Sequence, residues 1–220
     1  MYINFWYPAA LSEELKDEPI RARILGQNFV VFRDSKGQAH TLSDTCPHRG
    51  GALSAGVIRG DCIQCPYHGW RYDGEGYCRR IPSLGKDAKI PKRARVDAYP
   101  TQEQNGIVFT FLGDLEEKKR PPIMPIKELE DPESWRANWL TYEADINFER
   151  SIENGLDAAH NEFVHPTHGH EGADEDYQVN YLDFVDNMFG QKQWGFGFWH
   201  AFKSPASTKE SPQIKEASDE

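Results

Sequence analysis

Two short stretches, Cys46-Pro47-His48-Arg49-Gly50 and Cys65-Pro66-Tyr67-His68-Gly69-Trp70, decide what this chain folds around. Each stretch holds one cysteine and one histidine, in the pattern C-x-H, sixteen residues, C-x-x-H. Two tight pairs of this kind can close a four-ligand metal site from two loops. The proline after each cysteine stiffens its loop, and Gly50 and Gly69 allow the backbone to approach a metal centre closely.

The mixed ligand set predicts a [2Fe–2S] cluster of the Rieske type, in which two thiolates bind one iron and two neutral imidazoles bind the other. Its four ligands would be Cys46, His48, Cys65 and His68. Structural zinc is the alternative, but zinc sites usually pair cysteine with cysteine and histidine with histidine. A zinc site built on Cys62 and Cys65 would leave one motif histidine without a role. We therefore interpret Cys62 and Cys78 as small buried hydrophobic residues.

These residues resemble the Rieske domain of the Rieske non-haem iron oxygenases, in the alpha-type oxygenase component. Both motif halves match that family without a gap, and the resemblance extends to residues 4–8 and to the turn at Asp73-Gly74. Rieske proteins of respiratory complexes usually carry two further cysteines and an N-terminal membrane helix. Arg49 and Gly69 stand where those cysteines would fall, which favours the oxygenase branch.

Composition narrows the class of protein further. The 220 residues are 38% hydrophobic and carry a formal net charge of −10. The hydrophobic content is enough for a packed core, and the acidic surface argues against nucleic-acid binding. We see no secretory signal and no apolar run that could span a membrane, so we expect a cytoplasmic protein that binds neither nucleic acid nor membrane.

The first half of the chain reads as short strands separated by turn sequences, which predicts a small antiparallel barrel or sandwich over residues 1–115. The expected strands are Ile20–Ile24, 29–32, 39–42 and Ile107–Leu112, and the expected turns are 34–37, 73–76 and Asn105-Gly106. A short helix is expected at 12–16. Residues 116–134 are charged and rich in proline, which predicts a linker.

Residues 135–220 are predicted to be the beginning of a catalytic domain, which the resemblance implies to be an α+β helix-grip fold. A strand is expected at 139–142. Apolar residues at helical spacing then predict a helix that begins near Phe148, includes Ala159 and ends before Pro166. Residues 203–220 are polar and predict a disordered tail.

A second candidate metal motif lies on this helix. Asp157 and His160 are three residues apart and should share a helix face, and His165 follows just past the expected helix end. Taken alone, this pattern also fits surface and capping residues. The family carries N-x-x-D-x-x-H-x₄-H at this place, and Asn154 completes the match. By that resemblance His160 and His165 bind a mononuclear Fe(II), and Asp157 is the catalytic residue that links His68 of a neighbouring subunit to His160.

The family's third iron ligand is an acidic residue that lies well downstream of position 220. Asp183 and Asp186 are available carboxylates without the motif context, and His168 and His170 read as loop residues. We therefore expect the chain to be a fragment or a truncated product of a longer oxygenase. The substrate, and the choice between mono- and dioxygenation, are not encoded in these motifs.

The resemblance implies an oxygenase component that receives electrons from an NAD(P)H-dependent reductase, a ferredoxin or both. It would hydroxylate or demethylate a small organic substrate with O₂, as a homotrimer or an α₃β₃ assembly. The alternative is a Rieske electron-transfer protein without oxygenase activity of its own; a zinc-stabilised module is a third reading. A basic cluster fits either a docking site for an acidic redox partner or an ordinary solvated surface. It comprises Arg79, Arg80, Lys86, Lys89, Lys92, Arg93 and Arg95.

Overall fold

The computed structural model describes residues 3–123, 125–136, 144–157, 160–164, 190–192 and 195–197. The chain packs as two units, Met1–Arg136 and Ala137–Glu220. The predicted boundaries at 115/116 and 134/135 stay a prediction. Among the described residues, no helix is long and apolar enough to cross a membrane.

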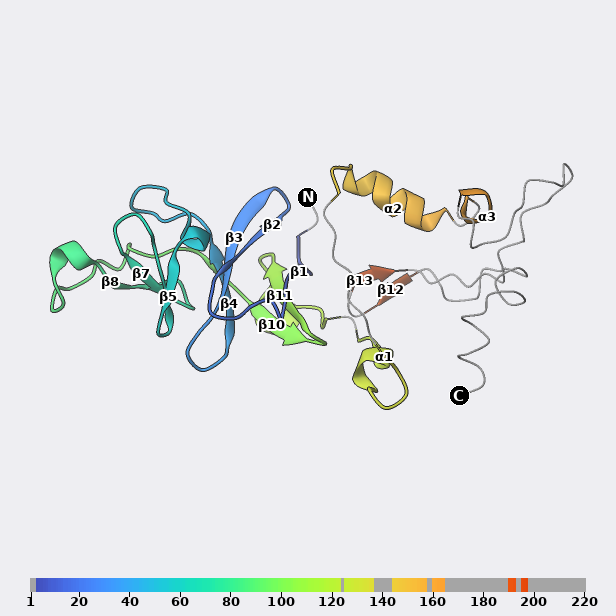
Figure 1. The fold of residues 1–220 in the computed structure, drawn as a ribbon, viewed down its shortest axis with the longest axis horizontal. Helices are drawn as coiled ribbons and strands as arrows, with labels where there is room; N and C mark the ends of the chain where they lie inside the picture. The colour runs from blue at the N-terminus through green and yellow to red at the C-terminus, as the bar shows by residue number, and fades with distance from the viewer. Residues whose placement is uncertain are drawn as a thin grey trace, which may run out of the picture. The chain divides into compact units, whose positions relative to one another are not determined.

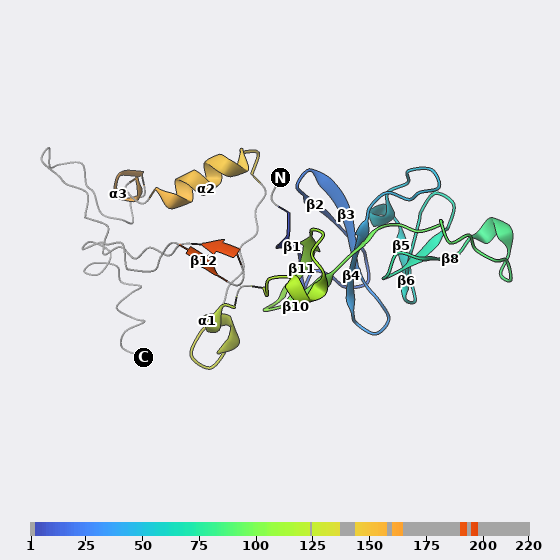
Figure 2. The same ribbon diagram turned by 180° about the vertical axis from the view of Figure 1, so that it is seen from behind.

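Within its described residues, the first unit is built from three antiparallel sheets (Figures 1 and 2). One sheet has the order β1-β11-β10, formed by Phe5–Leu11, Ile107–Leu112 and Thr101–Gln104. The second has the order β2-β3-β4-β9, formed by Ile20–Ile24, Gln27–Arg33, Ala39–Ser43 and Ala98–Tyr99. The third has the order β5-β6-β7-β8, formed by Val57–Arg59, Cys62–Gln64, Arg71–Asp73 and Cys78–Arg80. Short 3₁₀ turns lie between and after them at Leu53–Ala55 (η1), Pro82–Leu84 (η2) and Glu117–Lys119 (η3).

The predicted mainly β fold is confirmed, with strands at all four expected places. Asn105 and Gly106 both have positive φ, 53° and 78°, which is the backbone that a tight two-residue hairpin between β10 and β11 requires. The predicted helix at 12–16 is wrong. Only one α-helical hydrogen bond, from residue i to residue i−4, forms there, from Leu15 N–H to the Leu11 carbonyl at 3.2 Å. A single bond does not repay the cost of starting a helix, so the segment is a turn between β1 and β2.

Strand β3 separates two hydrophobic cores. Phe29 and Val31 face the core that lies between the β2–β3–β4 sheet and the β1–β11 pair. Val30 and Phe32 face the opposite core, which also contains Cys46 and Cys65. Successive side chains of a strand point to opposite faces, so four consecutive apolar residues serve both cores. All four are 1% exposed or less.

The second unit is described in four segments. Helix α2 (Phe148–Leu156) starts where Asn147 Oδ1 accepts the backbone N–H groups of Glu149 and Arg150. The helix predicted from Phe148 is confirmed as far as Leu156, whereas residues 139–142, Ala159 and the tail 203–220 lie outside the described part. A short helix and two paired strands complete it: α3 (Asn161–Val164), β12 (Gly190–Lys192) and β13 (Gly195–Gly197). The helix-grip fold stays a prediction. Helix α1 (Lys127–Glu130) belongs to the first unit.

Two of the sheets are joined by a buried pair of hydroxyl groups. Thr41 of β4 and Thr110 of β11 are both fully buried, and their Oγ1 atoms lie 2.7 Å apart. We expect Thr41→Val to lower the free energy of unfolding by about 1–3 kcal/mol, because it leaves the Thr110 hydroxyl buried without its partner. The double variant Thr41→Val/Thr110→Val should lose less than the sum of the two single variants. Urea unfolding of all four proteins measures this, and strictly additive losses would contradict it.

Candidate metal centre

The two motif loops have the same backbone geometry. In the first, Cys46 N–H donates to the Gly51 carbonyl at 2.9 Å, and Gly50 N–H donates back to the Cys46 carbonyl at 2.9 Å. In the second, Cys65 N–H donates to the Trp70 carbonyl at 2.8 Å, and Gly69 N–H donates back to Cys65 at 3.1 Å. Each loop therefore closes across the same five-residue step.

The glycines of these loops are required by the backbone. Gly50 and Gly69 have φ values of 71° and 72°, in the left-handed region that side chains other than glycine rarely adopt. The two loops also touch each other. A Cβ atom placed on Gly51 would lie 3.1 Å from the Cys65 sulfur and 3.4 Å from Cβ of Tyr67. A larger residue at position 51 would therefore press on the second loop.

The two motif cysteines lie side by side at the bottom of the site. Both residues are 2% exposed, and each belongs to the core behind β3. Burial raises the pKa of the Cys65 thiol, and the neighbouring Cys46 thiol raises it further. The backbone N–H groups of Tyr67 and His68 donate to the Cys65 sulfur and act in the opposite direction. Amide groups aimed at sulfur are the feature that a cluster-binding loop needs.

A buried tyrosine supports the other thiol. Tyr72 of β7 is fully buried, and its hydroxyl lies 3.2 Å from Cys46 Sγ. Burial and the bond to Cys46 both raise the pKa of Tyr72, so the hydroxyl stays protonated and is the donor to a thiolate. Our reading of the motif missed this residue. The pattern of β7 could have predicted Tyr72, because a strand with charged residues at 71 and 73 points the residue between them into the core.

The two motif histidines form the outer part of the site. The His48 and His68 rings lie 4.5 Å apart, and the Trp70 ring stacks on His48 at 4.6 Å with an interplanar angle of 6°. Burial lowers the pKa of His48, as do the nearby His68 and Arg49, which favours the neutral ring that a metal ligand must be. His48 Nδ1 is buried and has no hydrogen-bond partner among the described residues. His68 is exposed.

These observations test whether a Rieske cluster fits. Two adjacent thiols, two adjacent imidazoles and a buried ring nitrogen in need of a partner match the ligand set that the cluster takes. Within the described residues, no three histidine, cysteine or acidic side chains converge on one ion position. A binuclear cluster asks for two protein ligands at each iron.

The second motif is only partly described. The Asp157 carboxylate and His160 Nδ1 lie 3.6 Å apart, and the Asn154 amide nitrogen lies 3.3 Å from His160 Nε2. The prediction that Asp157 and His160 share a helix face is wrong. Helix α2 ends at Leu156, Asp157 has an extended ψ of 90°, and His160 precedes α3. Gly155 weakens the last turn of the helix, which ends before Asp157. His165, His168, His170, Asp183 and Asp186 lie outside the described residues.

The two remaining cysteines differ from each other. Cys78 is 7% exposed and packs in the same core as Cys46, as predicted. Cys62 is only half-buried in β6, opposite Asp73, so its interpretation as a fully buried residue is corrected. Strand β6 lies between β5 and β7, and its buried face carries Ile63, so Cys62 lies on the opposite, partly exposed face. All four cysteines are free thiols in the structure.

Comparison with known proteins agrees with this geometry. Residues 5–100 match the Rieske [2Fe-2S] domain. The chain is 35% identical over 164 residues to the 4beta-methylsterol monooxygenase of Methylococcus capsulatus, which covers 74% of this chain and 44% of that protein. It is 29% identical over 206 residues to the 3-chlorobenzoate-3,4-dioxygenase oxygenase subunit of Comamonas testosteroni, covering 92% and 47%. The chain belongs to the Rieske non-haem iron oxygenase family.

A solved structure of this oxygenase family shares the fold. Dicamba monooxygenase bound to dicamba superposes with a TM-score of 0.67 at 30% identity, over 74% of this chain and 48% of that one. The chain thus spans less than half the length of each of these three relatives.

The Tyr72 hydroxyl gives a test of the cluster assignment. A hydrogen bond to a cluster sulfur is stronger when the cluster is reduced and more negative, so Tyr72→Phe should lower the reduction potential. A difference of about 1 kcal/mol corresponds to about 40 mV for one electron. Tyr77→Phe is the matched control, since Tyr77 is exposed and its ring contacts the guanidinium groups of Arg79 and Arg95. Potentiometry of the three proteins decides; equal potentials would show that Tyr72 does not bond the cluster.

Proposed function

We propose that this chain forms the electron-accepting and iron-binding part of an oxygenase component. A cluster held by Cys46, His48, Cys65 and His68 supplies one-electron transfer when bound, and a mononuclear Fe(II) held by His160 and His165 supplies O₂ activation. The reaction is the O₂-dependent hydroxylation or demethylation of a small organic substrate. The electrons come from an NAD(P)H-dependent reductase, a ferredoxin or both, and the subunits assemble as a homotrimer or as α₃β₃.

The observation that carries this proposal is the difference in burial between the two ends of the two-loop site. The thiol pair lies in the core at 2% exposure, whereas His68 lies at the surface. The imidazole end is therefore the side on which an electron can enter or leave through a short contact. Stacking on Trp70 and the contact with His68 hold the His48 ring in place without a hydrogen bond.

In the second site, Asp157 has the role of a positioning carboxylate. It lies 3.6 Å from His160 Nδ1, and a carboxylate at that nitrogen orients the ring and sets its tautomer. The other ring nitrogen, Nε2, is then the one with a lone pair for a metal, on the side where the Asn154 amide lies. By the same proposal, Asp157 connects His68 of a neighbouring subunit to His160.

A second candidate is a Rieske electron-transfer protein without oxygenase chemistry of its own. It is favoured by the number of iron ligands in the second motif. The motif supplies two histidines, whereas a facial triad needs two histidines and a carboxylate. This candidate retains the cluster and gives His160 no part in metal binding.

Metal and sulfide analysis of the anaerobically purified chain separates the candidates. About three irons and about two sulfides per chain would support the oxygenase component, and about two of each would support the electron carrier. Zinc without sulfide would exclude both.

Substitution of the second-site histidine sharpens that test. We expect His160→Ala to remove about one iron per chain and to leave the sulfide content and the visible spectrum unchanged, because the cluster loops lie in the other unit. Cys65→Ser should abolish sulfide binding and the spectrum together. His168→Ala is the matched control and should behave as the parent chain. A His160→Ala protein with unchanged iron would contradict the role of His160 as a ligand.

A further inference from the structure

The segment 77–95 carries a charge opposite to that of the rest of the chain. It contains seven basic residues and one acidic residue, Asp87, and so has a formal net charge of +6. Because the whole chain has a net charge of −10, the remaining residues together carry −16. A local charge of this size and opposite sign creates a directed field at one place on an otherwise acidic surface.

Most of these basic groups are exposed and unpaired. Six of the seven are exposed side chains that form no salt bridge within the described part of the chain: Arg80, Lys86, Lys89, Lys92, Arg93 and Arg95. Arg79 is the exception, since it pairs with Asp73. The guanidinium groups of Arg79 and Arg95 lie over the Tyr77 ring at 5.6 and 5.1 Å, so the surface also contains an exposed aromatic ring.

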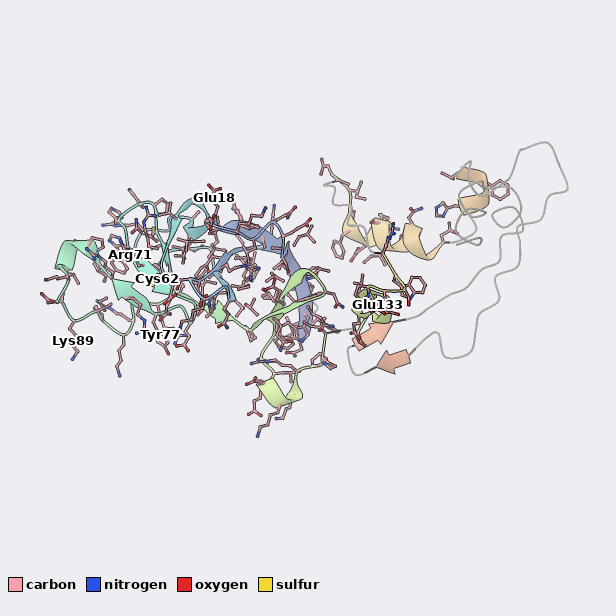
Figure 3. All side chains as sticks on the ribbon, turned by 60° about the horizontal axis from the view of Figure 1, so that its bottom comes forward. Glu18, Cys62, Arg71, Tyr77, Lys89 and Glu133 are labelled. Carbon is pink, nitrogen blue, oxygen red and sulfur yellow. The ribbon has the colours of Figure 1, made fainter. Side chains whose placement is uncertain are left out.

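The same segment is hollowed. Two hollows, of about 340 and 130 Å³, are both lined by Arg79, Ala88 and Ile90. Lys92 also lines the larger hollow, and Lys86 lines the smaller. A lining that combines apolar and basic side chains suits the acidic, partly apolar face of a protein partner. Figure 3 shows Lys89 near the tip of the first unit, with Tyr77 farther along the same edge.

The hollows lie against the cluster site. Cys78 lines the larger hollow and Ile81 the smaller, and both belong to the core that contains Cys46 and Cys65. The turn η2 touches the second motif loop, because a Cβ atom on Gly69 would lie 3.1 Å from Pro82 Cγ. A partner seated here would rest on the packed residues that surround the cluster cysteines.

We propose that the basic surface of residues 77–95 is the docking site for an acidic iron–sulfur protein that donates electrons to this chain. The inference rests on the proposed function, in that the chain must hold a reducible cluster. One electron leaves the reduced donor, which is oxidised, and reduces the oxidised cluster of the chain by one electron; no bond is made or broken. The potential of a plant-type ferredoxin, about −400 mV, lies below the range of Rieske centres, so the transfer runs downhill.

Stopped-flow absorbance with a stoichiometrically reduced plant-type [2Fe–2S] ferredoxin tests the proposal on the full chain. The variant Lys89→Glu/Lys92→Glu reverses two charges of the surface. Lys16→Glu/Lys118→Glu makes the same change in net charge at two exposed lysines outside it and is the matched control. At about 20 mM ionic strength we expect the first variant to lose about tenfold in second-order rate constant and the control less than about twofold. Both differences should vanish near 0.5 M salt, where the Debye length is only about 4 Å.

Reduction of the chain by dithionite, which needs no docking site, distinguishes failure of the docking proposal from failure of the proposed function. A parent chain with no cluster spectrum, or with none that dithionite bleaches, would overturn the proposed function. A chain that dithionite reduces but ferredoxin does not, a parent rate that is indifferent to salt, or equal losses in the two variants would overturn the docking site. If Lys89→Glu/Lys92→Glu does not retain its cluster, Lys86→Glu is compared with Lys16→Glu in the same way.

Discussion

The structure of the first unit depends on strand β3 being buried on both faces. Phe29 and Val31 serve one core and Val30 and Phe32 the other, so the strand cannot shift by one residue without exchanging the two sets. Its partner β4 is thereby fixed in register, with Val30 opposite Leu42. The first motif loop starts just beyond β4. The depth at which its cysteine lies is therefore set by the pairing of two strands that contain no metal ligand.

The base of that loop is closed by a buried acidic residue. Asp44 is 3% exposed, and its carboxylate accepts the Ser54 N–H at 2.6 Å and the Ser54 hydroxyl at 2.8 Å. Its carbonyl accepts Leu53 N–H at 2.9 Å. These bonds join the two ends of the loop that carries Cys46 and His48. A buried carboxylate would be costly without partners, so its full set of bonds ties the loop to the register of β4.

The cluster site was predictable because its chemistry is local. Each half-site needs a cysteine, a histidine and a glycine within five residues, and such spacing is visible in sequence alone. The strands of the first unit were predictable for a similar reason, since turn residues such as Asn105-Gly106 state their backbone requirement directly. Contacts between segments that are far apart in the chain were not predictable in this way. Tyr72 and Cys46 meet only because β7 and the first loop share a core. The end of α2 at Leu156 follows from the weak last turn at Gly155, whereas the apolar spacing predicted a longer helix.

Charge adds an orientation to this arrangement. An acidic donor is repelled by most of the chain, which carries −16 outside residues 77–95. At physiological salt the Debye length is about 8 Å, so a partner near the surface responds mainly to the charges directly beneath it. Attraction is then strongest at the segment that packs on the cluster core, where basic residues are densest in the sequence. A chain that is acidic overall but has one basic segment therefore favours an acidic partner. It also favours the orientation in which that partner approaches the basic segment. A uniformly basic surface would attract the same donor to places that are far from the two cluster loops.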